Sequence, residues 1–496
     1  MSVLTDSRSC EESAWVLSAN FVCALASLGL AVALLVLPVS AAARDNFLVI
    51  SIDDVGVDKV GIYNDDVTYG HPGEGADPAS TPTIDGLATE GVLFRNAYTN
   101  PTCAPTRAAT LSGRHGFRTG IGTPESAVLP ISETLLPELL AGTHLNAAVG
   151  KWHLGPDADR NHPNDSGFTD FAGSLGGGLP SYTSWNKVTN GSRQAGYSTY
   201  ATTDNVDEAI SLIAGFGASP WFMWLAFNAP HTPFHAPTPS TLHSETLSGN
   251  PNTTPIPHYA AALEAADTEL GRLLGAIPSD VLADTTILLF GDNGTPSQVV
   301  EPPFLAGRAK GSVYEGGINI PFIVKSPHVP VGHRGSESLG LVQTVDIFAT
   351  LAEIVSLSSP TAVDSLSFLP LLQNPLGAGN RSLVYTEGFS PNGFGPYASE
   401  QRAAVDGRYK LIWRDGVYEE MFDLELDPFE GTNLLPGPLS PDEQIAFDAL
   451  VAEIQRLHAT PVPAVFGLGS WLIAASVLLL GHRALRRAEK PDIRSA

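Results

Sequence analysis

The chain has 496 residues, with 27 Lys and Arg against 52 Asp and Glu, which gives a formal net charge of -25. This acidic balance excludes most nucleic-acid-binding proteins, because neutralising phosphates requires a basic face. Hydrophobic residues make up 43% of the chain and charged residues only 16%, which excludes an acidic disordered protein. We therefore expect a sizeable globular body, formed by one large domain or several smaller ones.

Residues 21–38 form an apolar run, FVCALASLGLAVALLVLP, and the small residues VSAAA follow it. This order is typical of a secretory signal, so we predict a signal peptide over residues 1–43 and an exported protein. The segment before the run is unusual, because Asp6, Glu11 and Glu12 outnumber Arg8. An uncleaved N-terminal anchor and a misassigned start are the alternatives.

Four apolar runs in the body of the chain end in polar residues. Residues 47–52 precede Asp53 and Asp54, 146–149 precede Lys151 and His153, 221–227 precede His231, and 286–290 precede Asp292 and Asn293. Short apolar runs that alternate with helical stretches indicate a mainly parallel sheet covered on both faces. Because ligands bind beyond the carboxyl ends of such strands, we expect these polar side chains to share one crevice.

Cys103 is the one cysteine that remains after the predicted signal peptide is removed, because Cys10 and Cys23 lie within it. A lone thiol in an exported protein is buried and inert, paired with another chain, or used in chemistry. The proline-broken sequence NPTCAPTR predicts a loop that turns into a helix near Pro105, with Gly113 as the stop. Cys103 would then lie just before a helix N-terminus, where backbone N–H groups favour an anion.

The polar residues of these segments fall into two chemical groups. One group offers only oxygen atoms as ligands: Asp53, Asp54, Asp292 and Asn293. Such a set suits a hard divalent ion such as Ca²⁺ or Mg²⁺ better than zinc. The other group carries positive charge or moves protons near neutral pH: Arg107, Lys151, Lys310, His153 and His231. Taken singly, each residue has an ordinary structural explanation, but together they describe a site for a tetrahedral oxyanion ester.

At the C-terminal end, residues 462–480 contain no charged side chain, and GHRALRR follows them. A helix of about 19 apolar residues just spans a bilayer core, and a basic flank stays in the cytoplasm. We predict a transmembrane or sorting-tail helix over 462–480 and a basic cytoplasmic tail over 481–496, which indicates a periplasmic or cell-surface protein anchored in the membrane. The ending also resembles bacterial PEP-CTERM sorting tails, although it has Val462-Pro463-Ala464 where they have Pro-Glu-Pro.

Several motifs together resemble the sulfatase family of the alkaline-phosphatase-like superfamily. The family's C-x-P-x-R core is similar to CAPTR at residues 103–107, which ATLSGRHGFRTG follows. The similarity continues in order through GKWHLG (150–155), NAPHTPFHAP (228–237), FGDNG (290–294), KGSVYEGGINIP (310–321), GRYKLI (407–412) and MFDLELDPFEGTNL (421–434). It covers nearly all of residues 45–457.

This resemblance implies an α/β fold with a large mixed, mostly parallel sheet sandwiched by helices, and a smaller C-terminal α+β subdomain of antiparallel sheet plus helix. We expect the catalytic domain over residues 45–375 and the subdomain over residues 376–460. The expected elements of the subdomain are strands around Val384, 403–405, 409–413 and 420–424, then a helix over 441–458. The Gly-rich segment 173–178 and the Pro-rich segment 230–257 are predicted as loops over the site.

By the same resemblance, a formylglycine-generating enzyme converts Cys103 to formylglycine, whose hydrated aldehyde is the nucleophile. One metal ion per chain, usually Ca²⁺ in the family, would be held by the four oxygen donors: Asp53, Asp54, Asp292 and Asn293. His115 follows the family signature, and we expect only a supporting role for it. Asn319 departs from the family pattern, because many relatives have Arg there, and this departure concerns local packing or substrate contacts.

The resemblance also implies roles for the basic residues. Arg107 and Lys151 would hold the formylglycine and the sulfate. His153 would take a proton when sulfate is expelled, while His231 and Lys310 would bind sulfate oxygens and protonate the leaving alcohol. These roles describe an arylsulfatase-like hydrolase whose substrate is an aryl or carbohydrate sulfate.

Two other functions stay open at this point. One is a formylglycine-dependent phosphonate or phosphodiester hydrolase of the same superfamily, and the other is a non-catalytic surface-anchored binding protein with an unconverted thiol. Rates on sulfate and phosphodiester substrates separate the first from a sulfatase, and the chemical state of Cys103 separates the second. The expected partners are a sulfated small molecule or saccharide, the maturation enzyme and the membrane, with no nucleic acid.

Overall fold

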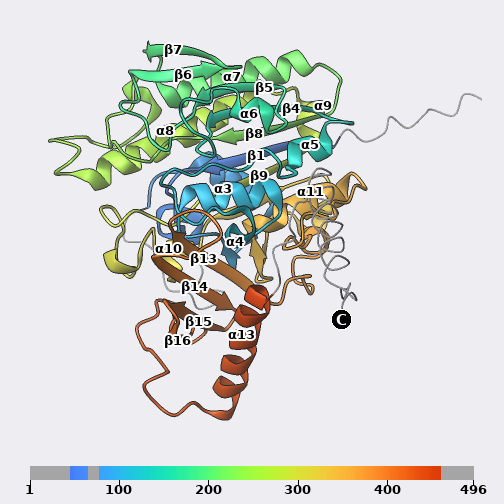
Figure 1. The fold of residues 1–496 in the computed structure, drawn as a ribbon. Coiled ribbons are helices and arrows are strands. Elements are labelled where there is room, and N and C mark those ends of the chain that lie inside the picture. Colours follow the sequence, from blue (N-terminus) through green and yellow to red (C-terminus); the bar gives the residue numbers. More distant parts are fainter. Residues whose placement is uncertain (1–44, 65–77, 460–496) are drawn as a thin grey trace, which may run out of the picture.

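A computed structural model describes residues 45–64 and 78–459 of the chain (Figure 1). The predicted signal peptide, the predicted membrane helix and the basic tail lie outside the described residues. Within the described ranges, no helix is both long and apolar enough to cross a membrane.

The body of the molecule is built on a ten-stranded mixed sheet with the order β11-β2-β10-β9-β1-β8-β4-β5-β6-β7. In chain order its strands are β1 (Asn46–Ile52), β2 (Val92–Phe94), β4 (Leu145–Lys151), β5 (Asp170–Ser174), β6 (Trp185–Thr189), β7 (Ser192–Tyr197), β8 (Trp221–Ala226), β9 (Thr285–Gly291), β10 (Phe322–Lys325) and β11 (Ser336–Ser338). The neighbours β9, β1, β8, β4 and β5 pair in parallel. Antiparallel pairs occur on both sides of this parallel middle. The predicted mostly parallel sheet is confirmed.

Helices cover both faces of this sheet, because successive residues of its central strands bury apolar side chains on opposite sides. Phe47 and Val49 of β1 belong to one hydrophobic core, and Leu48 and Ile50 belong to the other. The first core includes side chains of α3 (Cys103–Ser112), α5 (Leu136–Leu140) and α11 (Ile347–Ile354). The second includes side chains of α2 (Pro82–Glu90), α7 (Ala201–Phe216) and α8 (Pro255–Ala276). Burial on both faces explains why the central strands are continuous apolar runs.

Shorter elements connect these layers. They are the paired strands β3 (Ala97–Tyr98) and β12 (Val342–Gln343), and the helices α4 (Gly116–Thr119), α6 (His162–Asp165), α9 (Ser279–Ala283), α10 (Glu315–Ile318) and α12 (Leu369–Gln373).

A second, antiparallel sheet lies at one end of the molecule and carries the long helix α13 (Pro441–Ala459) beside it (Figure 1). Its strands, in spatial order, are β13 (Val384–Ser390), β14 (Ser399–Val405), β15 (Tyr409–Arg414) and β16 (Val417–Asp423). The predicted strands and the predicted helix of the C-terminal part are confirmed, with shifts of a few residues at their ends. The domain boundary near residue 375 stays a prediction.

Candidate active site

The polar residues that follow the central strands meet at one edge of the large sheet. Asp53 and Asp54 follow β1, Lys151 ends β4, and Asp292 follows β9, the strand beside β1. Lys151 Nζ donates to Asp53 Oδ2 at 2.6 Å, and the backbone N–H of Asp54 donates to Asp292 Oδ1 at 3.1 Å. The crevice that we expected at the carboxyl ends of the strands therefore brings these residues together.

The backbone of Asp54 is unusual, because its φ angle is 68°, in the left-handed region that few residues other than glycine adopt. Its carbonyl oxygen accepts the hydroxyl of Tyr259 in α8 at 2.7 Å. Its carboxylate accepts Asn293 Nδ2 at 2.9 Å and forms an ion pair with Lys310. Left-handed non-glycine residues persist where surrounding contacts fix them, which is common at active sites.

Cys103 is the first residue of α3, so this helix begins earlier than the predicted start near Pro105. The difference has a simple reason: proline is tolerated in a first helical turn, where backbone N–H groups have no partner within the helix. The helix ends as predicted at Gly113, which has a φ angle of 67°. The thiol of Cys103 is buried, with Sγ 3.3 Å from Nδ1 of His153, and burial raises its pKa.

Arg107 extends from α3 into the cluster of carboxylates. Its Nε and Nη2 donate to Asp292 Oδ2 at 3.0 and 2.8 Å, and its Nη1 donates to the carbonyl of Lys151 at 2.7 Å. Burial and the neighbouring carboxylate of Asp53 raise the pKa of Asp292 to about 6, against the opposing effect of Arg107. For Asp54, burial also favours the neutral acid, but the nearby cations, Lys310 first, hold its pKa well below the usual value.

The hydrogen bonds of His153 define which of its ring nitrogens is free. Its Nε2 lies 3.2 Å from the carbonyl oxygen of Pro124, which can only accept, so Nε2 carries the proton. Nδ1 is then unprotonated, and its lone pair faces Cys103 Sγ. Burial, then the charges of Lys151 and Arg107, lower the pKa of His153 to about 2. The ring is therefore neutral near neutral pH and presents its unprotonated Nδ1 to position 103, although the lowered pKa makes it a weaker proton acceptor than an ordinary imidazole.

His231 has the opposite arrangement. Its Nδ1 lies 2.8 Å from the carbonyl oxygen of Thr232, so Nδ1 carries the proton, and its Nε2 lies 3.9 Å from Asp54 Oδ2. Nε2 is thus the nitrogen that can exchange a proton with a ligand in the site. The two histidines therefore face the site with different nitrogens.

One observation supports a hard cation at the four oxygen donors predicted from the sequence. Oδ1 of Asp53 and Oδ1 of Asn293 are buried and have no hydrogen-bond partner among the residues that the structure describes. Buried oxygens are nearly always paired, in many cases with ordered water, so these two are available to water or to a bound cation. Ligand atoms of Asp53, Cys103 and Asp292 also lie within 4.8 Å of one another, as do those of Asp53, Asp54 and His231.

All ten residues predicted for the site therefore belong to one contact network: Asp53, Asp54, Cys103, Arg107, Lys151, His153, His231, Asp292, Asn293 and Lys310. Their individual roles stay predictions. His115, for which we expected a supporting role, packs its ring 5.1 Å from that of Tyr385 in β13, and its backbone N–H donates to Asp364.

Sequence reasoning missed two residues that contact the site. Tyr259, which holds the backbone of Asp54, lies in α8, far from the strand ends at which the sequence places the site. Gly177 lies so close to His153 that a Cβ atom there would be 2.4 Å from the imidazole ring. The Gly-rich segment 173–178 was expected over the site, but its sequence does not say which glycine meets which side chain.

Comparison with known proteins identifies the class. Residues 45–357 match the family model described as Sulfatase, and residues 309–457 match the C-terminal model of N-sulphoglucosamine sulphohydrolase. The chain belongs to the sulfatase family. This sulfatase is accordingly an enzyme of the sulfuric ester hydrolase class, and the resemblance found in its sequence is confirmed.

One curated relative of the sulfatase is N-acetylgalactosamine-6-sulfatase of Sus scrofa, 30% identical over 468 residues, which cover 86% of this chain and 80% of the relative. Among solved structures, Ps i-CgsB in complex with k-i-k-neocarrahexaose has a TM-score of 0.68 and 23% identity, covering 86% of this chain and 96% of that one. The phosphonate monoester hydrolase SpPMH from Silicibacter pomeroyi has a TM-score of 0.64 and 17% identity. The match covers 85% of this chain and 97% of that one. These two structural likenesses show the fold alone.

Proposed function

We propose that this sulfatase hydrolyses a carbohydrate or aryl sulfate ester, with Cys103 converted to formylglycine as the nucleophile. The observation that carries the proposal is the 3.3 Å contact between Cys103 Sγ and the unprotonated Nδ1 of His153, at the start of a helix and inside the polar cluster. Formylglycine supplies a hydrated aldehyde, with one hydroxyl for attack on sulfur and a second for expulsion of sulfate. The unprotonated Nδ1 of His153 is placed at this distance to take the proton of that second hydroxyl.

We assign the metal to the four oxygen donors: Asp53, Asp54, Asp292 and Asn293. The unpaired buried oxygens of Asp53 and Asn293 support this assignment, and oxygen ligands favour Ca²⁺. When bound, the ion withdraws negative charge from a sulfate oxygen as a Lewis acid. Cysteine at position 103 is not needed as a ligand in this arrangement.

The cations of the site would bind and orient the sulfate. Arg107 and Lys151 flank the carboxylates next to Cys103, and Lys310 pairs with Asp54 on the side of His231. His231 is fixed through Nδ1, so its Nε2 is the position from which a proton would reach the leaving alcohol. Fixed donors and charges of this kind stabilise the charge that develops on an oxyanion without reorganising.

The relatives favour a sulfated saccharide over a simple aryl sulfate as the natural substrate. Relatives 30% identical to this chain are named as N-acetylgalactosamine-6-sulfatases. The conversion of Cys103 would need a formylglycine-generating enzyme, and export through the predicted signal peptide would carry the chain to the periplasm or the cell surface. The predicted segment 462–480 would anchor it there, which cell fractionation with and without that segment tests.

The decisive experiment combines mass spectrometry of the peptide that contains residue 103 with sulfate release from sulfated sugars, on protein from its natural host. We expect formylglycine at position 103 and release of sulfate. Hydrolysis by a chain whose Cys103 is unmodified would contradict the nucleophile assignment. An unmodified Cys103 without any hydrolysis would favour the non-catalytic binding protein instead.

A phosphonate or phosphodiester hydrolase is the second candidate, which the sequence leaves open, and a phosphonate monoester hydrolase, SpPMH, shares the fold. Rates measured side by side on 4-nitrophenyl sulfate, a nitrophenyl phosphodiester and a phosphonate monoester separate the two functions. We expect the sulfate to be cleaved with the highest kcat/KM. A higher value on either phosphorus ester would replace the proposed reaction.

A further inference from the structure

A pocket of about 500 Å³ opens beside His231. It is lined by Leu179, Phe234 and prolines, together with the amide side chains of Asn252 and Gln298. None of its described lining residues is Lys, Arg, Asp or Glu. Apolar surface with a few amides suits the faces and hydroxyl groups of a sugar ring, and the volume lies in the ordinary range for small ligands, roughly 300–1,000 Å³.

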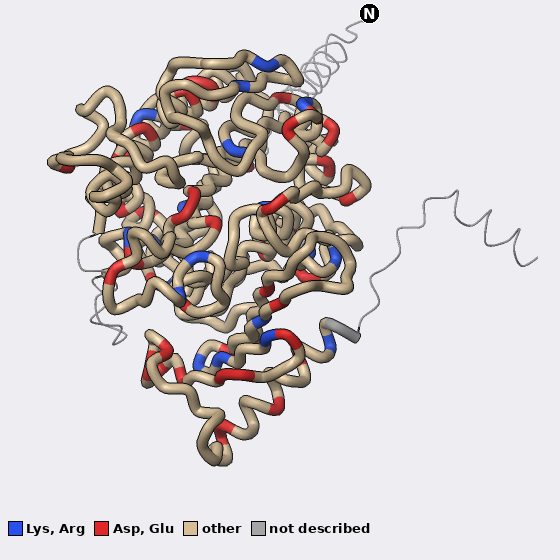
Figure 2. The backbone as a smooth tube through the Cα atoms, turned by 60° about the vertical axis from the view of Figure 1, so that its left-hand side comes forward, with Lys and Arg blue, Asp and Glu red and all other residues tan. Residues whose placement is uncertain are grey.

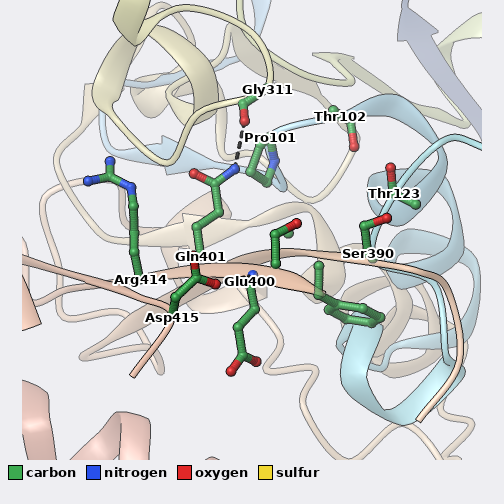
Figure 3. Close-up of a pocket in the computed structure, with 13 residues that line it drawn as sticks. Pro101, Thr102, Thr123, Gly311, Ser390, Glu400, Gln401, Arg414 and Asp415 are labelled. Atoms are coloured by element: carbon green, nitrogen blue, oxygen red, sulfur yellow. Dashed lines mark hydrogen bonds between the residues drawn. The ribbon is translucent and has the colours of Figure 1, made fainter. Parts of the chain in front are cut away.

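A second pocket, of about 280 Å³, lies between the C-terminal sheet and the segments next to Cys103 and Lys310 (Figure 3). Gln401 crosses it and donates to the carbonyl of Gly311 at 2.6 Å. Arg414 is its one described basic lining residue, and the carboxylates of Glu419 and Glu420 accept from Arg414 Nη1 at 2.7 and 3.1 Å. The positive charge in this pocket is therefore already compensated.

The cations of the catalytic cluster also pair with carboxylates, which are the proposed ligands of the metal. Arg107 pairs with Asp292 at 2.8 Å, Lys151 pairs with Asp53 at 2.6 Å, and Lys310 pairs with Asp54. Acidic residues are spread over the described chain with fewer basic residues between them (Figure 2), in line with the net charge of -25. A polyanionic substrate would be repelled by such a surface, and a second anionic group in the pocket beside His231 would lose its hydration without gaining a cation.

We propose that the natural substrate is a sugar that carries a single sulfate and is otherwise uncharged, and that its ring occupies the pocket beside His231. This inference rests on the proposed function, because it takes His231 as the residue that faces the leaving alcohol. It goes beyond that function by excluding multiply sulfated sugars and sugars linked to uronic acids as preferred substrates.

The test compares matched sugars that differ by one anionic group, such as N-acetylgalactosamine 6-sulfate with its 4,6-disulfate, and galactose 6-sulfate with its disulfate. We expect kcat/KM to be at least about 10-fold higher for each monosulfate at low salt, with a smaller ratio at about 1 M salt, where charges are screened within roughly 3 Å. Equal or faster hydrolysis of the disulfates would overturn the inference.

Substitution of Gln298 tests whether the preference for monosulfates arises in the pocket beside His231. Gln298→Lys introduces a cation beside the proposed sugar position and should lower the monosulfate preference at least 3-fold, whereas the uncharged control Gln298→Met should keep it. An unchanged ratio in Gln298→Lys would show that the sugar does not occupy this pocket.

Failure of the monosulfate inference can be distinguished from failure of the proposed function. Release of sulfate from 4-nitrophenyl sulfate but from no monosulfated sugar would overturn only the present inference. Release from no ester would overturn the proposed function, and calorimetric binding of the same sugar pairs to the chain would then decide the inference alone. Tighter binding of the disulfates would contradict it.

Discussion

Two of the buried clusters of cations and carboxylates in the described chain look alike in composition but differ in their contacts. In the first, next to the C-terminal sheet, Lys410 Nζ lies 2.9 Å from Glu315 and 2.8 Å from Glu430. The remaining oxygens of these two carboxylates accept Asn319 Nδ2 at 2.9 Å and the backbone N–H of Glu315 at 2.8 Å. Every carboxylate oxygen of this cluster therefore has a contact within the chain.

The second cluster, at the strand ends, is open. Oxygens of Asp53 and Asn293 lack partners, and the ring nitrogens of His153 and His231 that are not held by carbonyls face the site. In the first cluster the ion pairs of Lys410 compensate both buried carboxylates, which stabilises the fold. The unpaired oxygens of the second cluster are groups that water or a bound ligand would satisfy. Unpaired oxygens alone do not separate the two clusters, because Asn319 Oδ1 and Glu430 Oε1 of the first also lack a hydrogen-bond partner among the described residues. What marks the second cluster as a candidate active site is the thiol and the two imidazole nitrogens that face it.

The largest expected effect comes from the open cluster. Cys103→Ala should lower sulfate ester hydrolysis at least about 10⁴-fold, because removal of a nucleophile abolishes the covalent route. Far-ultraviolet circular dichroism and the unfolding temperature should change little, because the substitution removes only a sulfur atom, whose hydrogen-bonding contact in the described chain is with His153. Hydrolysis at the level of the unsubstituted chain would refute the role of Cys103.

Lys410→Met should act in the opposite way and reduce stability. Its side chain is 0% exposed, and its removal leaves two buried carboxylates without a cation, which costs about 3–5 kcal/mol in comparable cases. Arg408→Met is the matched control on the same strand region, because Arg408 forms a 2.7 Å ion pair with Asp423 but its side chain is 46% exposed. Chemical denaturation measures both, and equal effects would contradict the distinction between the two clusters.

Binding of Ca²⁺ should stabilise the chain through the open cluster only. Ca²⁺ at about 100 times its Kd should add roughly 2.7 kcal/mol to the free energy of unfolding, seen as a higher unfolding temperature than in chelator. Asp53→Asn should remove at least half of this gain, and Glu430→Gln, in the closed cluster, should keep it. A gain that survives Asp53→Asn would place the ion elsewhere.

The smallest effect is expected from the loop over His153. Gly177→Ala would bring a Cβ atom to 2.4 Å from the imidazole ring, which must then move away from position 103. We expect kcat to fall about 10-fold with little change in KM, because misplacing a proton acceptor affects the chemical step. Gly176→Ala is the control, since its Cβ would meet only the carbonyl of Gly178 at 3.8 Å. Equal kcat values in the two variants would refute the positioning role.

Much of the site could be predicted from the sequence because it follows the ends of regular strands. Asp53, Lys151 and Asp292 come directly after or at the end of apolar runs, and the parallel order of β9, β1, β8 and β4 brings them together. The fold class follows from the same runs. These predictions need only local pattern and the geometry of parallel sheets.

The remaining features depend on contacts between distant segments. The sequence marked Asn319 as a departure from its family, but only the structure shows that it bonds to Glu315 in the closed cluster. The approach of Gly177 to His153 and the uncharged character of the described residues that line the pocket beside His231 also arise from loops brought together in space. Periodicity in the sequence carries no information on such pairs.

The burial of Cys103 has a consequence for the order of events in the cell. Its side chain is 2% exposed at the base of the first turn of α3, so another enzyme cannot reach it in the finished molecule. Under the proposed conversion, the maturation enzyme must act while this segment is still extended. On that proposal, a chain that folds first would keep its thiol, and the yield of active protein would depend on the relative rates of modification and folding.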